Sequence, residues 1–403
     1  MNPDDLAELG EPRDHRDVAA LFEFCKECLA RKGYPAQFAD ATAFALVEAD
    51  ARGIYSHGAA GGTGLEEALV RTGVTATVDI HAVPERLPQT YPTIGVIDAQ
   101  GAPGHYTSRL AVEWVRELAG KHGMAKVYVF DGNHFGAAGI WSEEIAADHR
   151  FEAHVTCTTA GCVRLLGDDP RGVDYTRGAA VGGKHRLGTN PDAYSIPFNG
   201  GLFTIDMANT ELAASLCTKY FKEGMASGRT RSLPIPNYVA DESYRPTVDP
   251  TRVIRIRDGK LELPGSVFPY GGLRGYKGQI SLQRIEADHS FAGGPIQAVD
   301  AGDISQRRIS HAFEAQVIDF LYSREAALER MTALVRDWAD CGGPATRLPG
   351  ERSHLAREYS LRNGIPYSED QIQTLRRCGA SVGVDLANVP SSMRPFSKNL
   401  FTK

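Results

Sequence analysis

Segments with the character of strands and of helices alternate between residues 91 and 225, and this alternation restricts the fold more than any other feature. Residues 91–98 (YPTIGVID) are rich in β-branched side chains, which favours a strand. Residues 108–122 place apolar side chains at helical spacing, and Gly123 follows as a C-cap. A strand at 126–130 and a helix at 136–148 continue the order. Such alternation favours the α/β class.

The same patterns predict further elements on both sides of this stretch. Helices are expected at 16–31, 36–52, 62–73, 211–224 and, split near residues 324–325, over 305–337. Strands are expected at 151–159 and 201–206. The segments 165–186 and 390–403 are expected to be irregular, the first because of its glycines and aspartates.

Composition narrows the class of protein. The 403 residues suggest two or three domains, and 42% hydrophobic with 23% charged residues is typical of a globular chain. The net charge of −6 without a basic block argues against nucleic acid or an anionic membrane as a partner. No apolar run approaches the roughly 18–20 residues of a membrane helix. The polar, acidic N-terminus does not resemble a signal peptide, so a cytoplasmic location is expected.

Seven cysteines are present, of which Cys25 and Cys28 form a CxxC pattern inside a predicted helix. No second pair follows at the spacing of a zinc site. Two thiols on one helix are therefore the preferred interpretation over metal or redox chemistry, and no metal site is predicted.

The segment 49–58 (ADARGIYSHG) places Arg52, Ser56 and His57 where a predicted helix runs into glycines. Each glycine inside a helix costs about 1 kcal/mol, so the helix should end here. Catalytic groups are often found at such junctions, and histidine exchanges a proton near neutral pH. A serine hydrolase is not supported, because adjacent Ser and His rarely pair and no G-x-S-x-G elbow occurs.

A second candidate site is 133–139 (NHFGAAG), between a predicted strand and a predicted helix. Its small residues would let a ligand approach backbone N–H groups, and the helix dipole would favour an anion. The spacing is not the G-x-G-x-x-G of a Rossmann fold. An ordinary tight turn with a polar histidine is the alternative.

Four further segments carry weaker signals. Residues 271–278 (GGLRGYKG) and 347–352 (RLPGER) combine glycine with cations, which suits a phosphate or a solvated turn. Residues 188–191 (GTNP) form a turn signal. Asp206, at the end of a predicted strand, is either a helix cap or a carboxylate near the chemistry.

Taken together, six motifs resemble the malate/L-lactate dehydrogenase type 2 family, a non-Rossmann group of NAD(P)-dependent oxidoreductases. This group includes ureidoglycolate dehydrogenase, sulfolactate dehydrogenase, diketogulonate reductase and piperideine-2-carboxylate reductase. The resemblance covers about residues 16–380, with the motifs in family order. They are ADARGIYSHG (49–58), NHFGAAG (133–139), LGTNP (187–191), DMA (206–208), GGLRGYKG (271–278) and RLPGER (347–352).

The resemblance implies a fold and a division of the chain. An unusual α/β nicotinamide-binding domain on a mostly antiparallel sheet, residues 126–314, would lie between two helical parts. The N-terminal part, 1–125, would carry the substrate, and the C-terminal part, 315–403, would pack back on it. A homodimer is implied, with the active site near the subunit boundary.

The resemblance also implies roles for residues. His57, held by Ser56, would be the proton donor to a carbonyl or imine, and Asp206 would lie near the chemistry. NAD or NADP would be held by His134, Phe135, Gly136, Ala137, Ala138, Met207, Ala208, Asn209, Lys277, Arg347, Leu348, Pro349, Gly350 and Arg352. Thr189 or Asn190 would lie beside the substrate.

One departure from the family pattern bears on the substrate. The family usually continues SHGxxR, and that arginine binds a carboxylate, whereas Gly61 stands here. Glycine cannot replace a bidentate guanidinium contact. Either another cation (Arg52, Arg164 or Arg274) serves, or the substrate is larger or less anionic than a small 2-oxo acid.

The sequence therefore predicts an NAD(P)-dependent enzyme that reduces a C=O or C=N bond, or runs the reverse reaction. Two alternatives stay open: a specialised reductase for a bulky biosynthetic intermediate, and a dimeric relative that binds ligand without turnover.

Overall fold

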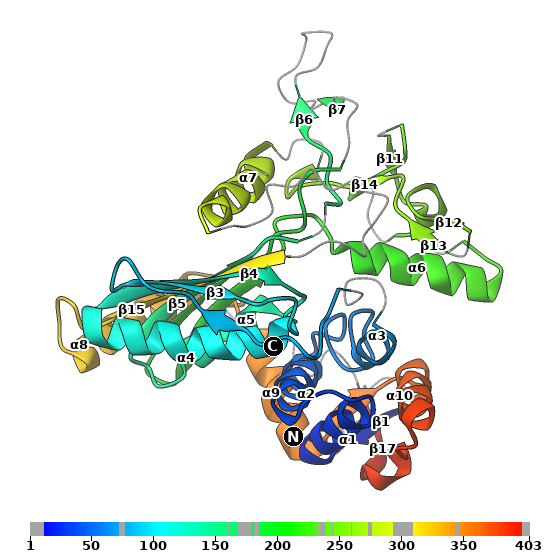
Figure 1. Ribbon diagram of the computed structural model, residues 1–403, viewed down its shortest axis with the longest axis horizontal. Coiled ribbons are helices and arrows are strands. Elements are labelled where there is room, and N and C mark those ends of the chain that lie inside the picture. Colours follow the sequence, from blue (N-terminus) through cyan, green and yellow to red (C-terminus); the bar gives the residue numbers. More distant parts are fainter. Residues whose placement is uncertain are drawn as a thin grey trace.

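The computed structural model describes most of the chain and shows a central sheet beside a helical region (Figure 1). The described residues are 12–71, 77–159, 161–167, 179–180, 185–230, 232–233, 238–243, 245–258, 260–272, 276–292, 309–342 and 346–396. Most of the predicted irregular segment 165–186 lies outside them.

The helices within this part of the chain are α1 (Val18–Arg31), α2 (Ala36–Ala51), α3 (Leu65–Val70), α4 (Gly104–His122), α5 (Ala138–Ala146), α6 (Ala214–Ser227), α7 (Tyr276–Ser290), α8 (Arg324–Gly342), α9 (Glu351–Asn363) and α10 (Glu369–Val382). The strands of the main sheet are β2 (Glu85–Arg86), β3 (Ile94–Asp98), β4 (Met124–Gly132), β5 (Phe151–Cys157), β8 (Asp192–Phe198), β9 (Gly201–Met207) and β15 (Ile309–Val317). The smaller pairings use β1 (Pro12–Arg16), β6 (Leu166–Gly167), β7 (Ala179–Ala180), β10 (Val239–Ala240), β11 (Pro246–Thr247), β12 (Arg255–Arg257), β13 (Lys260–Glu262), β14 (Ser266–Val267), β16 (Ile365–Tyr367) and β17 (Ser391–Pro395).

The main sheet has the order β2-β3-β4-β15-β5-β8-β9. Only β3 and β4 run parallel, and the other neighbours are antiparallel. The predicted mixed α/β fold with a mostly antiparallel sheet is therefore confirmed.

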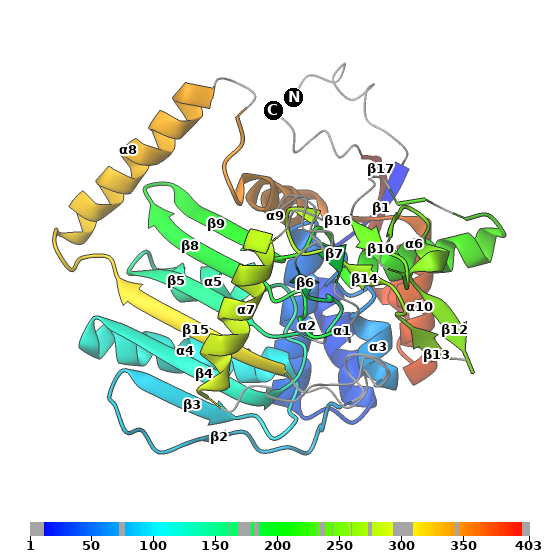
Figure 2. The ribbon, with the colours of Figure 1, turned by 90° about the horizontal axis from the view of Figure 1, so that it is seen from above.

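Helices cover both faces of this sheet, and the two faces differ in chemistry. α4 and α5 pack on one face over buried side chains such as Val127, Val155 and Phe313. α7 crosses the opposite face (Figure 2), where Lys126 donates to its Asp288 and Arg284 on the helix reaches Asp192. Alternation along each strand separates the apolar face from the polar one.

The two ends of the chain form a second core. β1 pairs with β16 on one side and with β17 on the other, both antiparallel. α1, α2, α3 and α10 bury one shared hydrophobic cluster that includes Leu21, Phe38, Tyr367 and Leu375. A third cluster, with Val163, Cys217 and Leu282, lies among α6, α7 and the short strands β10 and β14. Whether the predicted boundaries at 125 and 314 are domain boundaries stays a prediction.

Two local predictions are wrong. The segment 305–337 was expected to be helical, yet Ile309–Val317 is β15, in the middle of the main sheet, and the helix begins only at Arg324. Ile309, Phe313 and Ala315 alternate with polar residues, and pairing with β4 and β5 on both sides outweighs any local helical tendency. The tail was expected to be irregular, but Ser391–Pro395 pairs with β1.

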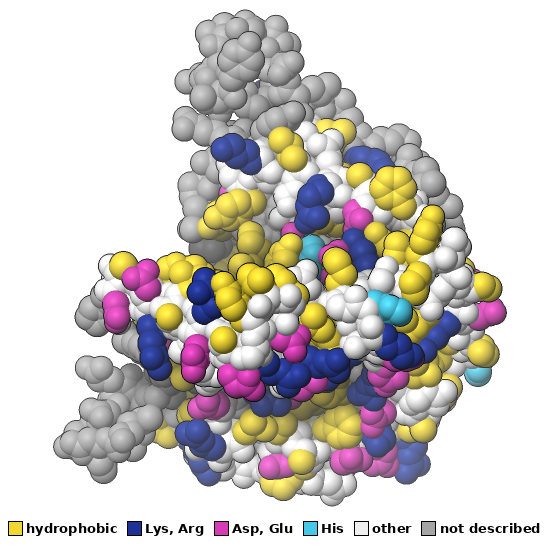
Figure 3. Space-filling model, turned by 90° about the vertical axis from the view of Figure 1, so that its left-hand side faces the viewer, with side chains coloured by type: hydrophobic (Ala, Val, Ile, Leu, Met, Phe, Trp, Pro, Cys, Tyr) yellow, Lys and Arg dark blue, Asp and Glu magenta, His cyan; other side chains and the backbone are white. Residues whose placement is uncertain are grey.

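Other sequence features keep their expected character. Cys25 and Cys28 are buried free thiols on α1, and burial raises the pKa of Cys28 to about 12. In the described residues, no helix combines the length and apolar character needed to cross a membrane. Basic and acidic side chains are interspersed on the face shown in Figure 3, as the modest net charge suggests.

Candidate active site

The Ser56–His57 turn is built on a buried carboxyl that the sequence reasoning missed. Asp50, in the last turn of α2, accepts hydrogen bonds from the Ala59 amide at 2.8 Å and the Tyr367 hydroxyl at 2.5 Å. Burial raises the pKa of Asp50 to about 7, although both hydrogen bonds oppose the shift. A Cβ at Gly58 would lie only 1.7 Å from Asp50 Oδ1, so the turn rests directly on this carboxyl.

The glycine at position 61 is required by the same turn. A Cβ there would lie 2.5 Å from the Tyr55 carbonyl oxygen and 2.7 Å from that of Ser56. Contacts that short with backbone force the turn to move. The backbone of this turn therefore leaves no room for a side chain at position 61, where the SHGxxR pattern has its arginine.

The side chains of Ser56 and His57 lie within hydrogen-bond distance of each other. Ser56 Oγ is 2.8 Å from His57 Nδ1, and the His57 ring stacks on that of His134 with centroids 5.5 Å apart. His57 keeps some solvent contact, but the surrounding protein desolvates it and lowers its pKa to about 4. The ring is therefore neutral at pH 7 and ready to accept a proton.

His134 belongs to a loop that is anchored from beneath. Asn133 donates to the carbonyls of Gly101 and Ala102 at 2.7 and 3.1 Å, and Gly136 adopts φ 84°, which favours glycine. α5 then begins at Ala138, and its N-cap residue Ala137 supplies no side-chain cap. The loop thus presents backbone N–H groups at a helix start, the arrangement that suits an anion.

Two further histidines surround this loop, and neither was singled out from the sequence. His105, at the start of α4, is buried with its Nε2 lacking a hydrogen-bond partner among the described residues. His311, on β15, stacks on Phe135 at 4.3 Å. Burial lowers the pKa of His105 to about 4 and that of His311 to about 3. A lone histidine inside a helix or strand pattern gave no signal of this clustering.

Asp206 and the turn before α9 meet at the end of β9. A Cβ at Gly139 would lie 2.8 Å from Asp206 Oδ2, so the carboxyl lies against the start of α5. Although Asp206 retains solvent contact, desolvation raises its pKa to about 6, against the hydrogen bond from the Gly139 amide. Gly350, the N-cap of α9, packs against Thr204, two residues before Asp206. Predicted segments at 134–138, 206–207 and 347–352 are thus connected.

Asn190 and Asn209 belong to a buried network of hydrogen bonds. The Asn190 side chain accepts from the Thr159 amide and donates to the Leu282 carbonyl on α7, at 2.9 and 3.2 Å. Asn209 donates to the Asn190 carbonyl at 2.7 Å. With its amide group used in this way, Asn190 is not well placed for the predicted substrate contact, whereas Thr189 remains half-buried beside it.

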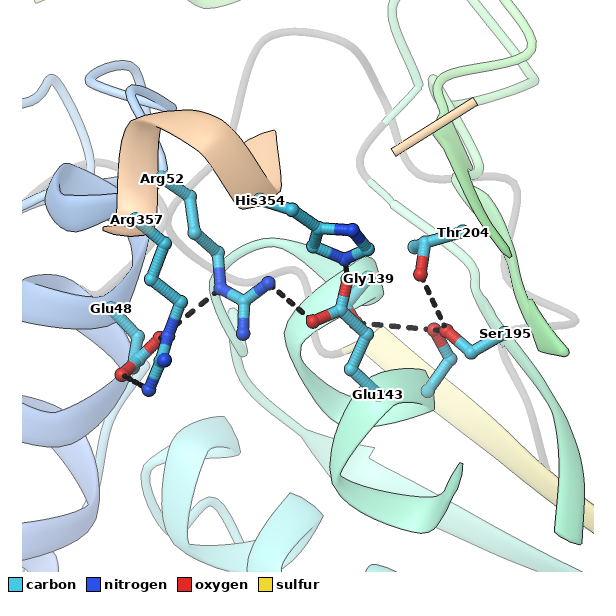
Figure 4. A network of polar contacts seen from close by, with 9 residues as sticks. Glu48, Arg52, Gly139, Glu143, Ser195, Thr204, His354 and Arg357 are labelled. Atoms are coloured by element: carbon cyan, nitrogen blue, oxygen red, sulfur yellow. Dashed lines mark hydrogen bonds and ion pairs between the residues drawn. The ribbon is translucent and has the colours of Figure 1, made fainter. Parts of the chain in front are cut away.

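The predicted substrate cations are engaged in other contacts. Arg52 is buried and paired with Glu48 and Glu143 (Figure 4). Arg164 donates to the carbonyls of Glu242 and Pro264 at 3.1 and 2.9 Å. Arg274 lies outside the described residues.

The remaining predicted cofactor residues lie near the surface. Lys277 is exposed in the first turn of α7. Arg347 and Pro349 are exposed in the turn before α9 and Arg352 in the first turn of α9, while Leu348 is half-buried. Met207 is exposed and Ala208 half-buried just after β9.

A model of the malate/L-lactate dehydrogenase family matches residues 17–376. The chain belongs to this family. L-sulfolactate dehydrogenase of Methanothermobacter thermautotrophicus is 29% identical over 251 residues, 62% of this chain and 63% of that protein. Ureidoglycolate dehydrogenase (NAD(+)) of Escherichia coli K12 is 27% identical over 258 residues, 64% of this chain and 63% of that protein. The chain thus aligns with just under two thirds of each relative.

The solved structure of sulfolactate dehydrogenase from Methanocaldococcus jannaschii has the same fold, with a TM-score of 0.73 at 21% identity. The similarity covers 93% of this chain and 99% of that one. The predicted family is confirmed by the match.

Proposed function

We propose that this protein is an NAD(P)-dependent oxidoreductase that interconverts a C–OH or C–NH group with C=O or C=N, with His57 as the acid and base. The observation that carries the proposal is the His57 ring, fixed by Ser56 at Nδ1 and stacked on His134 within a family of dehydrogenases. The nicotinamide supplies the hydride chemistry when bound.

The local structure fits such a cofactor. α5 and α9 both begin without side-chain caps, and Asp206 and Gly350 bring these two helix starts to the end of β9. The start of α9 suits a pyrophosphate, whereas the first turn of α5 already donates its Gly139 amide to Asp206. We assign the cofactor to residues 134–138, 207–209, 277 and 347–352.

His57 does the proton work in this mechanism. In the oxidative direction its neutral ring accepts the proton of the substrate hydroxyl or amine at Nε2, because Ser56 already engages Nδ1. In the reductive direction the same nitrogen returns a proton to the developing oxyanion or amide ion. The lowered pKa of His57 keeps its ring unprotonated at neutral pH, which is the form that can accept a proton.

The substrate is proposed to be larger or less anionic than a small 2-oxo acid. Position 61 has no room for an arginine, and both Arg52 and Arg164 are held by other protein groups. Thr189 is the residue retained as a substrate contact. The homodimer and the cytoplasmic location remain predictions from the resemblance and the sequence.

The deciding experiment is a titration of the protein with NADH and NADPH, side by side, followed by fluorescence or calorimetry. Micromolar binding of one cofactor, weakened by Lys277→Ala, supports the proposal. Binding of neither would favour a ligand-binding relative without turnover. Efficient reduction of pyruvate-sized 2-oxo acids would contradict the proposed substrate class.

A further inference from the structure

Two side chains on one face of α9 reach two different helices. His354 Nε2 lies 2.8 Å from Glu143 Oε1 on α5. Arg357, three residues later, donates to both carboxylate oxygens of Glu48 on α2, each at 2.8 Å. The helix that follows the 347–350 turn is therefore held by the sheet region and by the N-terminal core at once.

Arg52 joins these two contacts into one chain. Its Nε donates to Glu48 Oε2 at 3.1 Å, and its Nη1 donates to Glu143 Oε2 (Figure 4). We call the five residues the ion-pair chain: Arg357, Glu48, Arg52, Glu143 and His354. The side chains of Arg52 and Glu143 are only 8% and 9% exposed. Burying such charges costs free energy, and well-packed apolar side chains in their place would often stabilise a fold to the same extent or more.

Three members of the ion-pair chain lie close in sequence to segments of the candidate active site. Arg52 lies four residues before Ser56, and Glu143 lies on α5, which follows the His134 loop. His354 lies in the first turn of α9, and its amide bonds to the Gly350 carbonyl at 3.0 Å. Arg52, Glu143 and His354 are thus each within about one and a half helical turns of a segment assigned to the chemistry.

A series of hydroxyl groups connects Glu143 with a further segment, the end of β9 that carries Asp206. Ser142, beside Glu143, lies 2.8 Å from Ser195, and Ser195 lies 3.2 Å from Thr204 on β9. Thr204 is the residue on which Gly350 packs, two positions before Asp206. The two networks are adjacent on α5, where Ser142 and Glu143 are neighbours in sequence, and Figure 4 shows Glu143 and Ser195 beside this helix.

We propose that Arg52, Glu143 and His354 are positioning residues that hold the acid–base turn, the His134 loop and the turn before α9 in one mutual arrangement. The role in cofactor binding rests on the proposed function. In this proposal Arg52 supports the site through Glu48 and Glu143 and does not contact the substrate. Glu143 is the central member, because its two oxygens serve the two other residues.

The electrostatics agree with a tightly held carboxylate. Burial alone would raise the pKa of Glu143, but the hydrogen bond from His354 and the charge of Arg52 outweigh it and lower the pKa to about 2. Glu143 therefore stays ionised at neutral pH and keeps both contacts.

Hydrogen exchange of the full-length protein without cofactor tests the proposal directly. In Glu143→Gln, amides in three separate segments, 52–58, 133–139 and 347–353, should exchange about tenfold faster or more, because buried charges lose their partner. Ser360→Ala is the matched control: it removes a 3.0 Å hydrogen bond from α9 to the Ala51 carbonyl outside the ion-pair chain. It should leave 133–139 unchanged.

Faster exchange confined to α5, or the same acceleration at every amide, would overturn the proposal. So would an identical pattern in Ser360→Ala. Should Glu143→Gln fail to fold, His354→Leu and His354→Gln replace it: the leucine should speed exchange at 133–139 and 347–353, and the glutamine, which keeps a donor, should restore wild-type rates.

A cofactor titration of the same variants separates this proposal from the proposed function. Glu143→Gln should weaken NADH or NADPH binding about tenfold to a hundredfold, as displaced supporting residues do elsewhere, and Ser360→Ala should not. If the wild type binds neither cofactor, the proposed function fails, while the exchange pattern still decides whether the ion-pair chain connects the three segments. Unchanged affinity in a variant with faster exchange would reject the role in cofactor binding.

Discussion

Two clusters of side chains in this protein contain histidine, and they shift the histidine pKa in opposite directions. The imidazole cluster is His57, His105, His134 and His311, where burial without a carboxylate partner lowers each pKa. The charge ladder is Lys126, Glu314, His154 and Tyr194, which face one another in register across β4, β15, β5 and β8.

In the charge ladder, burial would also lower the pKa of His154, but hydrogen bonds to Asp192 and Glu314 outweigh it and raise the pKa. His154 Nε2 lies 2.7 Å from Asp192 Oδ1, and Lys126 lies 2.7 Å from Glu314. The same side chain is thus kept neutral where proton transfer is proposed and favoured as a cation where α7 is held on the sheet. A carboxylate within reach makes the difference.

The largest contrast should appear in turnover. His57→Asn removes the proposed acid and base and should lower turnover by about 10²- to 10⁴-fold with cofactor binding retained. His154→Asn removes a histidine of the other group and should leave turnover near that of the wild type. Steady-state kinetics with the cofactor and substrate found by screening measure both. Equal losses in the two variants would contradict the assignment of His57.

The second contrast is the pH dependence of stability. The unfolded chain binds protons on its histidines near pH 6.5, whereas the folded imidazole cluster binds them only near pH 4 or below. The unfolded state therefore binds more protons between these values, and stability should fall as pH falls from about 6.5 to 4. His105 alone accounts for at most about 3 kcal/mol of this loss.

Urea unfolding at several pH values measures this dependence. His311→Leu removes one titrating group from the imidazole cluster and should flatten the slope between pH 4 and 6.5. A slope equal to that of the wild type would mean that His311 is protonated in the fold.

Local sequence patterns predicted much of the secondary structure, but they predicted only some of the residues that surround the candidate active site. Period-2 and helical spacing predicted β3, β4, α4 and α5 within a few residues. β15 was missed because its Ala, Glu and Gln residues also favour a helix, and its strand state depends on two distant partners.

The site residues show the same limit. His57 and His134 were singled out because their motifs co-occur in one family, but Asp50, His105 and Glu143 carry no local signal. Their roles arise from contacts across the fold, such as Asp50 with Tyr367 and Glu143 with His354. Arg52 was noticed as a cation, but the sequence alone does not reveal that two carboxylates neutralise its charge.

A smaller effect is expected inside the charge ladder. Glu314→Gln removes the charge between Lys126 and His154 and should destabilise the fold by about 1 kcal/mol, a modest figure because this ladder is partly exposed. The raised pKa of His154 should move back toward its ordinary value, because one of its two carboxylate partners is lost. NMR titration of His154 measures the shift. An unchanged pKa would show that Asp192 alone sets it.

The smallest effect concerns the ring that ends the charge ladder. The rings of His154 and Tyr194 stack with centroids 3.9 Å apart and planes 7° from parallel. Tyr194→Leu keeps an apolar cover at this partly exposed position but removes the stacked π system, so a loss of about 0.5 kcal/mol is expected. A protonated imidazole gains more from an aromatic face than a neutral one does. The loss should therefore be greater at pH 5 than at pH 9, which urea unfolding at the two values would measure. A loss independent of pH would show that Tyr194 only covers His154, and that the carboxylates alone favour its charge.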